Sequence, residues 1–285
     1  MKDVTNAIRA HILTAAVPYI KQYTDQYVVV KYGGNAMIDE ELKKPVMKDL
    51  LLLQLVGVKV VLVHGGGPAI NSTLDAMQIE SHFANGLRVT DEATMDVVQM
   101  VLAGKVNKGL VADLTDLGGK AIGLCGVDGN MIQVHKQNEE LGYVGSIDTI
   151  DTSIIQDVIS RGYIPVISSI GMGADGKTYN INADTVAAKV AGALKAETMV
   201  AMTNIDGVLR DVHDPESLIS KITVAEAEQL KAEGIIAGGM IPKVDCCLEA
   251  IEAGAQKVFI INGEIPHAIL IELLTNEGLG TMFVK

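Results

Sequence analysis

Two lysines in this sequence stand beside glycine pairs, and this combination suits the binding of an anion. Lys31 ends a run of valines and is followed by the stretch YGG, while Lys243 comes four residues after the glycine pair in GGMIPKV. Glycine lets backbone N–H groups approach a ligand with no Cβ in the way. A lysine near a helix start opposes the helix dipole, and an anion between them removes that conflict. We therefore interpret each stretch as glycine-rich backbone that shares an anion with one lysine.

A third glycine-rich stretch, VLVHGGGPAIN, places three glycines between an apolar run and a helix start marked by Pro68. The backbone N–H groups of Gly66 and Gly67 can approach a ligand there, and the helix dipole favours an anion. A tight turn between strand and helix needs one or two glycines, so three in a row favour a bound ligand. We interpret His64, which precedes them, as a packed residue at the strand end rather than a catalyst.

Polar residues in two further stretches could bind a carboxylate or stabilise a helix start. In NGLRVT, Arg88 lies in an expected loop, and its planar guanidinium suits a bidentate carboxylate, although an ordinary surface arginine is the alternative. In YNINADTVA, Asn180, Asn182 and Asp184 lead into an expected helix. Asn182 or Asp184 can cap that helix without any further function. Three polar groups in an otherwise apolar neighbourhood nevertheless indicate a role in addition to helix capping.

Two common nucleotide-binding motifs are incomplete or absent in the sequence. Residues 171–176, GMGADG, have the spacing of a dinucleotide-binding loop, but KTYNIN follows them instead of the helix that such a loop must open. No phosphate loop of the form GxxxxGKS or GxxxxGKT is present. A glycosylation sequon at Asn71 stands alone, and nothing else indicates secretion. The sequence therefore favours neither a nicotinamide-dependent enzyme nor a P-loop NTPase.

The composition favours a cytoplasmic protein whose partners are small molecules. The net charge is −12, from 23 basic and 35 acidic residues, which argues against general binding of nucleic acid. No uncharged apolar stretch reaches about 18 residues, so we expect no membrane-spanning helix. Cys125, Cys246 and Cys247 have the spacing of neither a disulfide framework nor a zinc site, which indicates free thiols in a reducing compartment.

Strands and helices are expected to alternate along the chain, and most of the motifs fall where a strand ends. We expect strands at 27–31, 59–64, 121–125, 163–171, 198–203, 257–263 and 280–285. We expect helices at 4–23, with a kink at Pro18, and at 41–56, 68–77, 90–103, 149–161, 184–194, 224–233 and 241–253. Residues 128–148 are expected as irregular strands or a hairpin at the sheet edge. Continuous aliphatic runs and the alternation predict a three-layer αβα sandwich around a mainly parallel sheet, with ligands beyond the carboxyl ends of its strands.

Taken together, the motifs resemble those of the amino acid kinase family. Six stretches stand in that family's order over nearly the whole chain: KYGGNAM, HGGGPAI, NGLRVT, NINADT, TNIDGVL and GGMIPK. KYGGNAM and NGLRVT are most similar to the members that phosphorylate the side-chain carboxylate of N-acetyl-L-glutamate in arginine biosynthesis. The resemblance implies an α/β fold with two lobes that share the sheet. Residues 1–195 would bind acetylglutamate and make oligomer contacts, and residues 196–285 would bind ATP, with Mg²⁺ held mainly through its phosphates.

The resemblance also implies roles for individual residues around the nucleotide. Lys31 and Lys243, one from each lobe, would contact the transferring phosphoryl group, and Asp184 would position both lysines. The residues expected to lie around ATP are Gly33, Gly34, Thr203, Asn204, Ile205, Asp206, Gly207, Val208, Gly238, Gly239 and Met240. No residue is expected to bind a metal ion directly.

For the acceptor, the resemblance implies that Gly66 and Gly67 offer backbone N–H groups, Arg88 holds the α-carboxylate and Asn180 holds the acetylglutamate. A γ-carboxylate has an ordinary pKa of about 4.3, so it is already ionised near neutral pH and needs no general base. Positioning and electrostatic stabilisation must then provide nearly all of the catalysis. The alternatives are another family member acting on a small carboxylate or carbamate, and a catalytically silent nucleotide-binding regulator.

The residues before Lys31 resemble the arginine-inhibited, hexameric branch of the family, in which a kinked N-terminal helix interlaces dimers. This resemblance implies a homohexamer built as a trimer of dimers, with L-arginine as an inhibitor bound near Tyr19, Glu277 and Gly280. A helix that only packs on the sheet is the alternative. The sequence does not decide whether a PII-type signalling protein binds.

Overall fold

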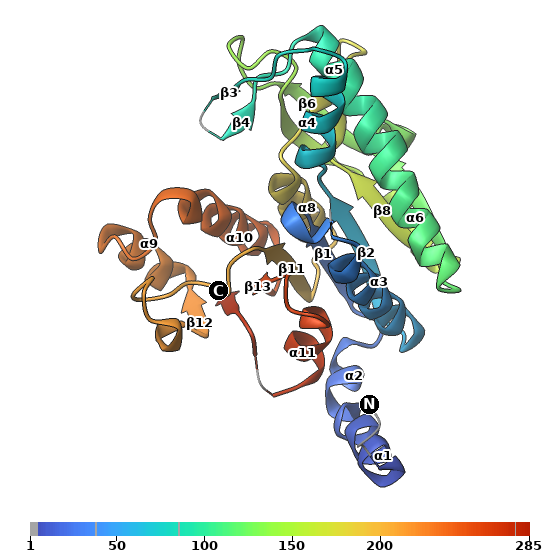
Figure 1. Cartoon of the computed structure of the whole chain (residues 1–285), viewed down its shortest axis with the longest axis vertical. Helices are drawn as coiled ribbons and strands as arrows, with labels where there is room; N and C mark the ends of the chain where they lie inside the picture. The colour runs from blue at the N-terminus through green and yellow to red at the C-terminus, as the bar shows by residue number, and fades with distance from the viewer. Residues whose placement is uncertain (1–4, 38, 85, 277) are drawn as a thin grey trace.

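The computed structural model describes residues 5–37, 39–84, 86–276 and 278–285. Within them an eight-stranded sheet runs through the middle of the molecule in the order β12-β14-β13-β11-β1-β2-β8-β5 (Figure 1). Neighbouring strands are parallel except β13 and β14, which are antiparallel. The strands are β1 Tyr27–Tyr32, β2 Lys59–His64, β5 Ala121–Cys125, β8 Ile164–Ser168, β11 Thr198–Thr203, β12 Lys221–Thr223, β13 Lys257–Asn262 and β14 Thr281–Val284. This confirms the mainly parallel sheet.

Helices cover both faces of this sheet, because alternate side chains of each strand point to opposite faces. Val29 of β1 packs into a cluster that contains residues of α7, α8 and α10, whereas Val28 and Val30 pack into a second cluster with α3, α6 and α11. Each buried valine stabilises the fold by about 1.5–3 kcal/mol. The helices are α1 Asn6–Ala15, α2 Val17–Tyr23, α3 Glu40–Leu55, α4 Gly67–Ala76, α5 Glu92–Gln99, α6 Asn107–Asp116, α7 Ser153–Ser160, α8 Ala183–Ala193, α9 Val224–Ala232, α10 Ile241–Ala253 and α11 Ala268–Leu274. The three-layer αβα sandwich is confirmed.

A second, four-stranded sheet stands beside the first and differs from the sequence prediction. Its strands, in the order β10-β9-β6-β7, are β6 Ile132–Lys136, β7 Gly145–Ile150, β9 Ile170–Gly173 and β10 Thr178–Asn180. Residues 128–148 therefore contribute to a separate sheet, not to an edge of the main one. The single strand expected at 163–171 is divided at Ser169, whose carbonyl accepts a hydrogen bond from Ile181 N at 3.0 Å. A two-stranded hairpin, β3 Phe83–Ala84 and β4 Leu87–Arg88, completes this side of the molecule.

The helix expected at 90–103 is longer than predicted. It begins after Asp91, whose carboxylate accepts a hydrogen bond from Thr94 N at 2.8 Å, and continues through a π-helical turn, Met100–Val106, into α6. Gly104 and Gly109 lower the helix propensity at its centre, but Leu110 and other residues along it are buried, so packing outweighs propensity.

Other boundaries also changed. The helix expected at 4–23 divides at Ala16 into α1 and α2, with Pro18 in the first turn of α2. The helix expected at 149–161 begins only at Ser153, because β7 extends to Ile150. Strand β12 and helix α11 were not predicted from the sequence. None of the helices in the described part of the chain combines the length and the apolar character that crossing a membrane requires.

Candidate functional site

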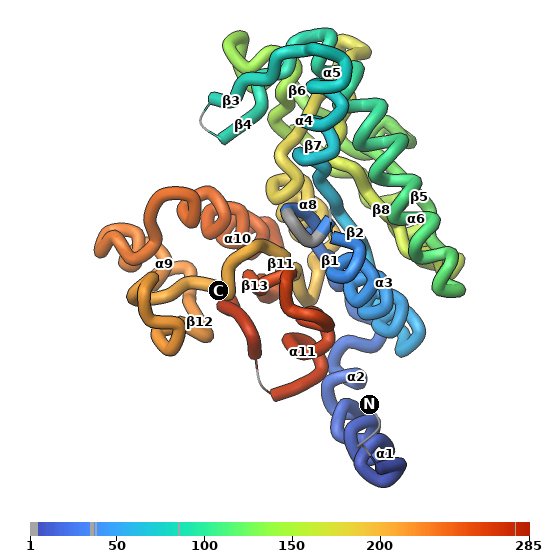
Figure 2. Tube along the Cα trace, viewed as in Figure 1, coloured from blue at the N-terminus to red at the C-terminus, as the bar shows by residue number. Residues whose placement is uncertain are grey.

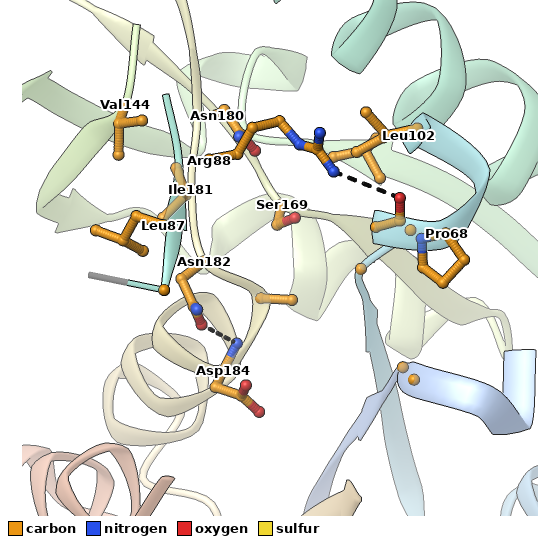
Figure 3. Close-up of a pocket in the computed structure, with 18 of the residues that line it drawn as sticks. Pro68, Leu87, Arg88, Leu102, Val144, Ser169, Asn180, Ile181, Asn182 and Asp184 are labelled. Atoms are coloured by element: carbon orange, nitrogen blue, oxygen red, sulfur yellow. Dashed lines mark hydrogen bonds between the residues drawn. The ribbon is translucent and has the colours of Figure 1, made fainter. Parts of the chain in front are cut away.

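A cavity of about 380 Å³ opens at the carboxyl edge of the main sheet (Figure 3). The register of β1 and β2 places Lys31 beside Val63 and Tyr32 beside His64, so the lysine and the glycine triplet leave the sheet at the same edge. Eight of the residues to which the family resemblance gives a role line this cavity: Lys31, Gly33, Gly34, Gly66, Gly67, Arg88, Asn180 and Asp184. The parallel strands thus bring together groups that lie far apart in the sequence.

Lys31 lies at one end of the cavity and is paired with Asp184. Its Nζ is 3.1 Å from Asp184 Oδ1, and the two side chains are only 10% and 22% exposed. Asp184 is in the first turn of α8, but Asn182 caps this helix, accepting hydrogen bonds from Asp184 N at 2.8 Å and from Thr185 N at 3.3 Å. The Asp184 carboxylate is therefore available to hold the lysine.

Gly33 leaves space for the amine of Lys31. A Cβ at Gly33 would lie 3.1 Å from Lys31 Nζ and 3.3 Å from its Cε. Any larger residue would press on the amine and move it from Asp184. Gly34 has a φ of 71°, a left-handed conformation that favours glycine, and nothing lies within 4 Å of the position of its Cβ. Gly33 therefore provides space beside the lysine, whereas Gly34 permits a left-handed backbone conformation.

Arg88 lies at the other end of the cavity and is not a surface arginine. The residue is 6% exposed, and its guanidinium stacks on the Phe83 ring at 4.7 Å. It donates hydrogen bonds to Ser81 Oγ, to Asn71 Oδ1 at 2.5 Å and to Gly67 O at 3.5 Å. All three acceptors are uncharged, no carboxylate is paired with Arg88 within the described residues, and burial lowers its pKa.

Asn71 is a site residue that the sequence analysis missed. It lies four residues after Gly67 on α4, and residues at this spacing share one face of a helix. That spacing was enough to place Asn71 beside the glycine turn. In the sequence, Asn71 is recognised only as part of a glycosylation sequon. Its side chain holds Arg88 at the cavity wall.

Asn180 reaches the cavity from the end of β10 in the second sheet. Its Nδ2 donates to Thr90 Oγ1 at 3.3 Å, and Thr90 Oγ1 donates in turn to Arg88 O at 2.8 Å. Its backbone N donates to Tyr143 O at 2.9 Å. The second sheet is therefore the element that brings an amide group next to the arginine.

The glycine triplet forms the wall between the two ends. Gly66 has an extended backbone, and a Cβ there would lie 2.7 Å from Leu102 Cδ2, whereas nothing lies within 4 Å of the corresponding position at Gly67. The first N–H groups of a helix have no intrahelical acceptor, and Pro68 has no N–H at all. The N–H groups of Gly66 and Gly67 can therefore bind an anion in the cavity.

The residues expected from the C-terminal lobe do not line this cavity within the described part of the chain. Lys243 is half-buried in the first turn of α10, directly after the turn Gly238–Met240. Helix α10 packs against α8 (Figure 2). At this contact, Cys246 Sγ is 4.0 Å from Thr185 Oγ1. The start of α10 thus lies close to the helix start that carries Asp184.

Residues 203–208 leave the same edge of the sheet on the other side of β1. Strand β11 runs beside β1 with Ala201 opposite Lys31, and Thr203 ends it. Thr203 Oγ1 accepts a hydrogen bond from Ile205 N at 3.1 Å, and Val208 N donates to Thr281 Oγ1 at 2.8 Å. Residues 204–207 connect these two points: Asn204, Ile205, Asp206 and Gly207.

The residues named for arginine binding lie near α2 and the start of β14. Tyr19 packs against the cluster that contains α3 and α11, and Leu279 packs against the same cluster. A Cβ at Gly280 would overlap Ile260 O, so packing alone requires this glycine. Glu272, whose pKa is raised by burial, accepts hydrogen bonds from Leu279 N and Gly280 N. Glu277 lies outside the described residues.

Comparison with known proteins places this geometry in context. The profile of the "Amino acid kinase family" matches residues 26–262. The protein named "Acetylglutamate kinase" from Heliobacterium modesticaldum is 50% identical, over 97% of this chain and 98% of its own length. That from Brachyspira hyodysenteriae is also 50% identical, over 100% of both chains. Among solved structures, N-acetylglutamate synthase from Neisseria gonorrhoeae, complexed with coenzyme A and N-acetyl-glutamate, matches with a TM-score of 0.84 and 27% identity. That match covers 97% of this chain and only 63% of the longer synthase.

Proposed function

The chain belongs to the amino acid kinase family, and we propose that it transfers the γ-phosphoryl group of ATP to the γ-carboxylate of N-acetyl-L-glutamate. The products are N-acetyl-L-glutamyl 5-phosphate and ADP, and the reaction belongs to arginine biosynthesis. The observation that carries this proposal is Arg88, a buried cation that faces a cavity without a carboxylate partner in the described residues. Burial of an unpaired charge is unfavourable, and a bound carboxylate would relieve it.

The two ends of the cavity fit a substrate with two carboxylates. Arg88 holds the α-carboxylate, and Asn180 hydrogen-bonds the substrate beside it. The γ-carboxylate then extends along the glycine wall toward Lys31. The N–H groups of Gly66 and Gly67 bind its oxygens and the phosphoryl group that approaches them.

The chemical difficulty is to bring one anion against another. The γ-carboxylate needs no general base, because it is ionised near neutral pH. Charge spreads over the phosphoryl oxygens during transfer, and Lys31 stabilises it from the acceptor side while Asp184 keeps the amine in place. Lys243 acts from the first turn of α10, a helix whose second turn contacts the first turn of α8. We assign residues 1–195 to the acceptor and residues 196–285 to ATP.

The nucleotide is expected at the carboxyl edge between β1 and the start of α10. The backbone of residues 203–208, Gly33, Gly34 and the turn Gly238–Met240 would surround it. Within the described residues, no group of three or more acidic, histidine or cysteine side chains could hold a metal ion, and Asp184 is paired with Lys31. We expect Mg²⁺ to be held mainly by the ATP phosphates, as is common for this ion. When bound, it neutralises charge on the transferring group.

The test is an assay that couples ADP release to NADH oxidation, with Mg-ATP and each candidate acceptor. Turnover with N-acetyl-L-glutamate should exceed that with aspartate or carbamate, which are too short to reach both ends of the cavity. It should also exceed that with glutamate, whose charged α-ammonium group replaces the acetyl amide beside Asn180. Faster turnover with any of the other three, or none with any of them, would contradict the proposal.

The N-terminal helices support a second part of the proposal, namely assembly and feedback inhibition. Ile8, Ile12, Leu13 and Val17 are 50–72% exposed, so this apolar surface has no cover within the described chain. We infer that it packs between dimers in a hexamer and that L-arginine binds between α2 and residues 278–280. Deletion of residues 1–24 should reduce the mass seen in sedimentation and weaken arginine inhibition. A full-length enzyme that does not respond to arginine would refute the regulatory part alone.

A further inference from the structure

We propose that His64 and Asn107 are positioning residues that orient the glycine turn, residues 65–67, toward the acceptor. Neither side chain reaches the cavity, and His64 is completely buried at the end of β2. This inference rests on the proposed function for its kinetic consequences. Its structural basis is independent of the identity of the acceptor.

The tautomer of His64 follows from its two hydrogen bonds. Nδ1 is 2.8 Å from Gly65 O, and a carbonyl oxygen can only accept, so Nδ1 carries the proton. Nε2 is 3.0 Å from Asn107 Nδ2, which can only donate, so Nε2 is unprotonated. Burial lowers the pKa of His64 to about 4, which keeps the ring neutral near pH 7.

The orientation of the Asn107 amide is determined in the same way. Its Nδ2 also lies 2.8 Å from Val166 O, so an exchange of its oxygen and nitrogen would place two acceptors together. Its Oδ1 is buried without a hydrogen-bond partner in the described residues. An unpaired buried oxygen is unfavourable. The orientation that serves His64 and Val166 therefore leaves the other end of the amide unpaired.

The consequence for the site follows from the planarity of the peptide. The C=O of Gly65 and the N–H of Gly66 belong to one trans peptide and point in opposite directions. The imidazole holds the carbonyl toward the protein interior, and this turns the Gly66 N–H toward the cavity. Without that hydrogen bond, a glycine peptide can rotate and present its oxygen to an anion. Such a rotation would replace attraction of the acceptor by repulsion.

The π-helical turn supports the same glycine turn from the other side. A Cβ at Gly66 would lie 2.7 Å from Leu102 Cδ2 and 3.3 Å from Val106 Cγ2. Asn107, the next residue, then reaches His64. One continuous helix therefore contacts both the glycine turn and His64, and π-helical turns are frequent at functional sites.

Two substitutions separate this role from simple packing. In His64→Asn, the side-chain amide nitrogen occupies nearly the position of Nδ1 and can still donate to Gly65 O. In His64→Gln, the amide lies near the position of Nε2, so the bond to Asn107 can form while that to Gly65 is lost. Both remove the ring, and we expect similar decreases in Tm. We expect kcat/KM for N-acetyl-L-glutamate to stay within about threefold of wild type for His64→Asn and to fall about 100-fold for His64→Gln.

Equal kinetic losses in the two variants, or losses that follow Tm, would overturn the proposal. A ¹⁵N spectrum of the imidazole provides a readout that does not depend on activity. It should show a neutral Nδ1–H ring at pH 7 in wild type and a mixture of tautomers in Asn107→Leu, and an Nε2–H ring in wild type would refute the inference. If another carboxylate proved to be the acceptor, the proposed function would fail. The same difference in kcat/KM between the two His64 variants, measured with that acceptor, would still support the positioning role of His64.

Discussion

Replacing Arg88 with glutamine should remove acceptor binding while leaving the fold as stable as before. The substitution leaves the α-carboxylate of the bound substrate without its cation. Breaking one half of a buried ion pair costs about 3–5 kcal/mol. At about 1.4 kcal/mol for each factor of ten, the affinity for N-acetyl-L-glutamate should fall by roughly 10²-fold to several thousand-fold.

Arg88→Gln should have only a small effect on the free energy of unfolding of the free protein. In the free protein the guanidinium is desolvated and its hydrogen-bond acceptors are uncharged. Its removal loses the stacking on Phe83, about 0.5–2 kcal/mol, but also relieves the buried charge. The free energy of unfolding should therefore change by less than about 1 kcal/mol in either direction.

Two measurements check this prediction against a control, Arg161→Gln, which removes an exposed arginine distant from the cavity. Calorimetric titration should give a weaker Kd for Arg88→Gln and no change for the control. Acetylglutamate at 100 times the wild-type Kd should stabilise wild type by about 2.7 kcal/mol and Arg88→Gln hardly at all. A Kd within threefold of wild type would refute the assignment of Arg88, and unfolding weakened by several kcal/mol would show that its role is structural.

Three further predictions concern the cation, the glycine wall and one buried acid. Lys31→Ala should lower kcat about 10²- to 10³-fold with little change in Kd for the acceptor, by comparison with the loss of one oxyanion-hole donor, and an unchanged kcat in the coupled assay would exclude the proposed mechanism. Gly66→Ala should destabilise the fold by about 1–3 kcal/mol in urea unfolding, because its Cβ would meet Leu102, whereas Gly67→Ala should keep stability and lose turnover; the reverse order would contradict the geometry. Burial raises the pKa of Asp49 from 3.8 to about 6, although His267 hydrogen-bonds it, so the folded state retains a proton that the unfolded state loses first. Its contribution to stability should therefore decrease as pH rises from about 4 to about 6, and the difference between wild type and Asp49→Asn in urea unfolding should show this slope; a difference independent of pH would refute it.

The sequence was sufficient for the part of the cavity built from β1 and β2. An apolar run that stops at a lysine or a glycine indicates a buried strand of a parallel sheet. The residue that ends the run then lies at the carboxyl edge, where ligands bind. Lys31 and the glycine triplet were therefore placed together by pattern alone. Arg88 was harder, because a loop arginine is equally compatible with an exposed position. Its burial depends on Phe83, Asn71 and Ser81, which come from different elements.

The hairpin of β6 and β7 was among the structures expected for residues 128–148, but the separate sheet that it forms with β9 and β10 was not predicted. Its strands are short and its register depends on close packing, as at Gly171, where a Cβ would lie 2.6 Å from Val134 Cγ1. Such contacts join residues that no local pattern relates. The π-helical turn is another case, since its glycine lowers helix propensity and only burial of the flanking residues shows that the helix continues. These are the elements that deliver Asn180 and Asn107 to the site.

The start of α8 shows why a helix cap and a functional carboxylate are better supplied by two residues than by one. A carboxylate that caps a helix is directed at backbone N–H groups, so its charge is not available to a neighbouring lysine. Asn182 takes the capping role with an uncharged amide oxygen, and Asp184 can then hold Lys31 at 3.1 Å. Because the start of α8 lies beside the sheet edge, Lys31 of β1 is paired with a carboxylate on the helix. The amine is thereby fixed before any ligand arrives, as electrostatic stabilisation of a transition state requires.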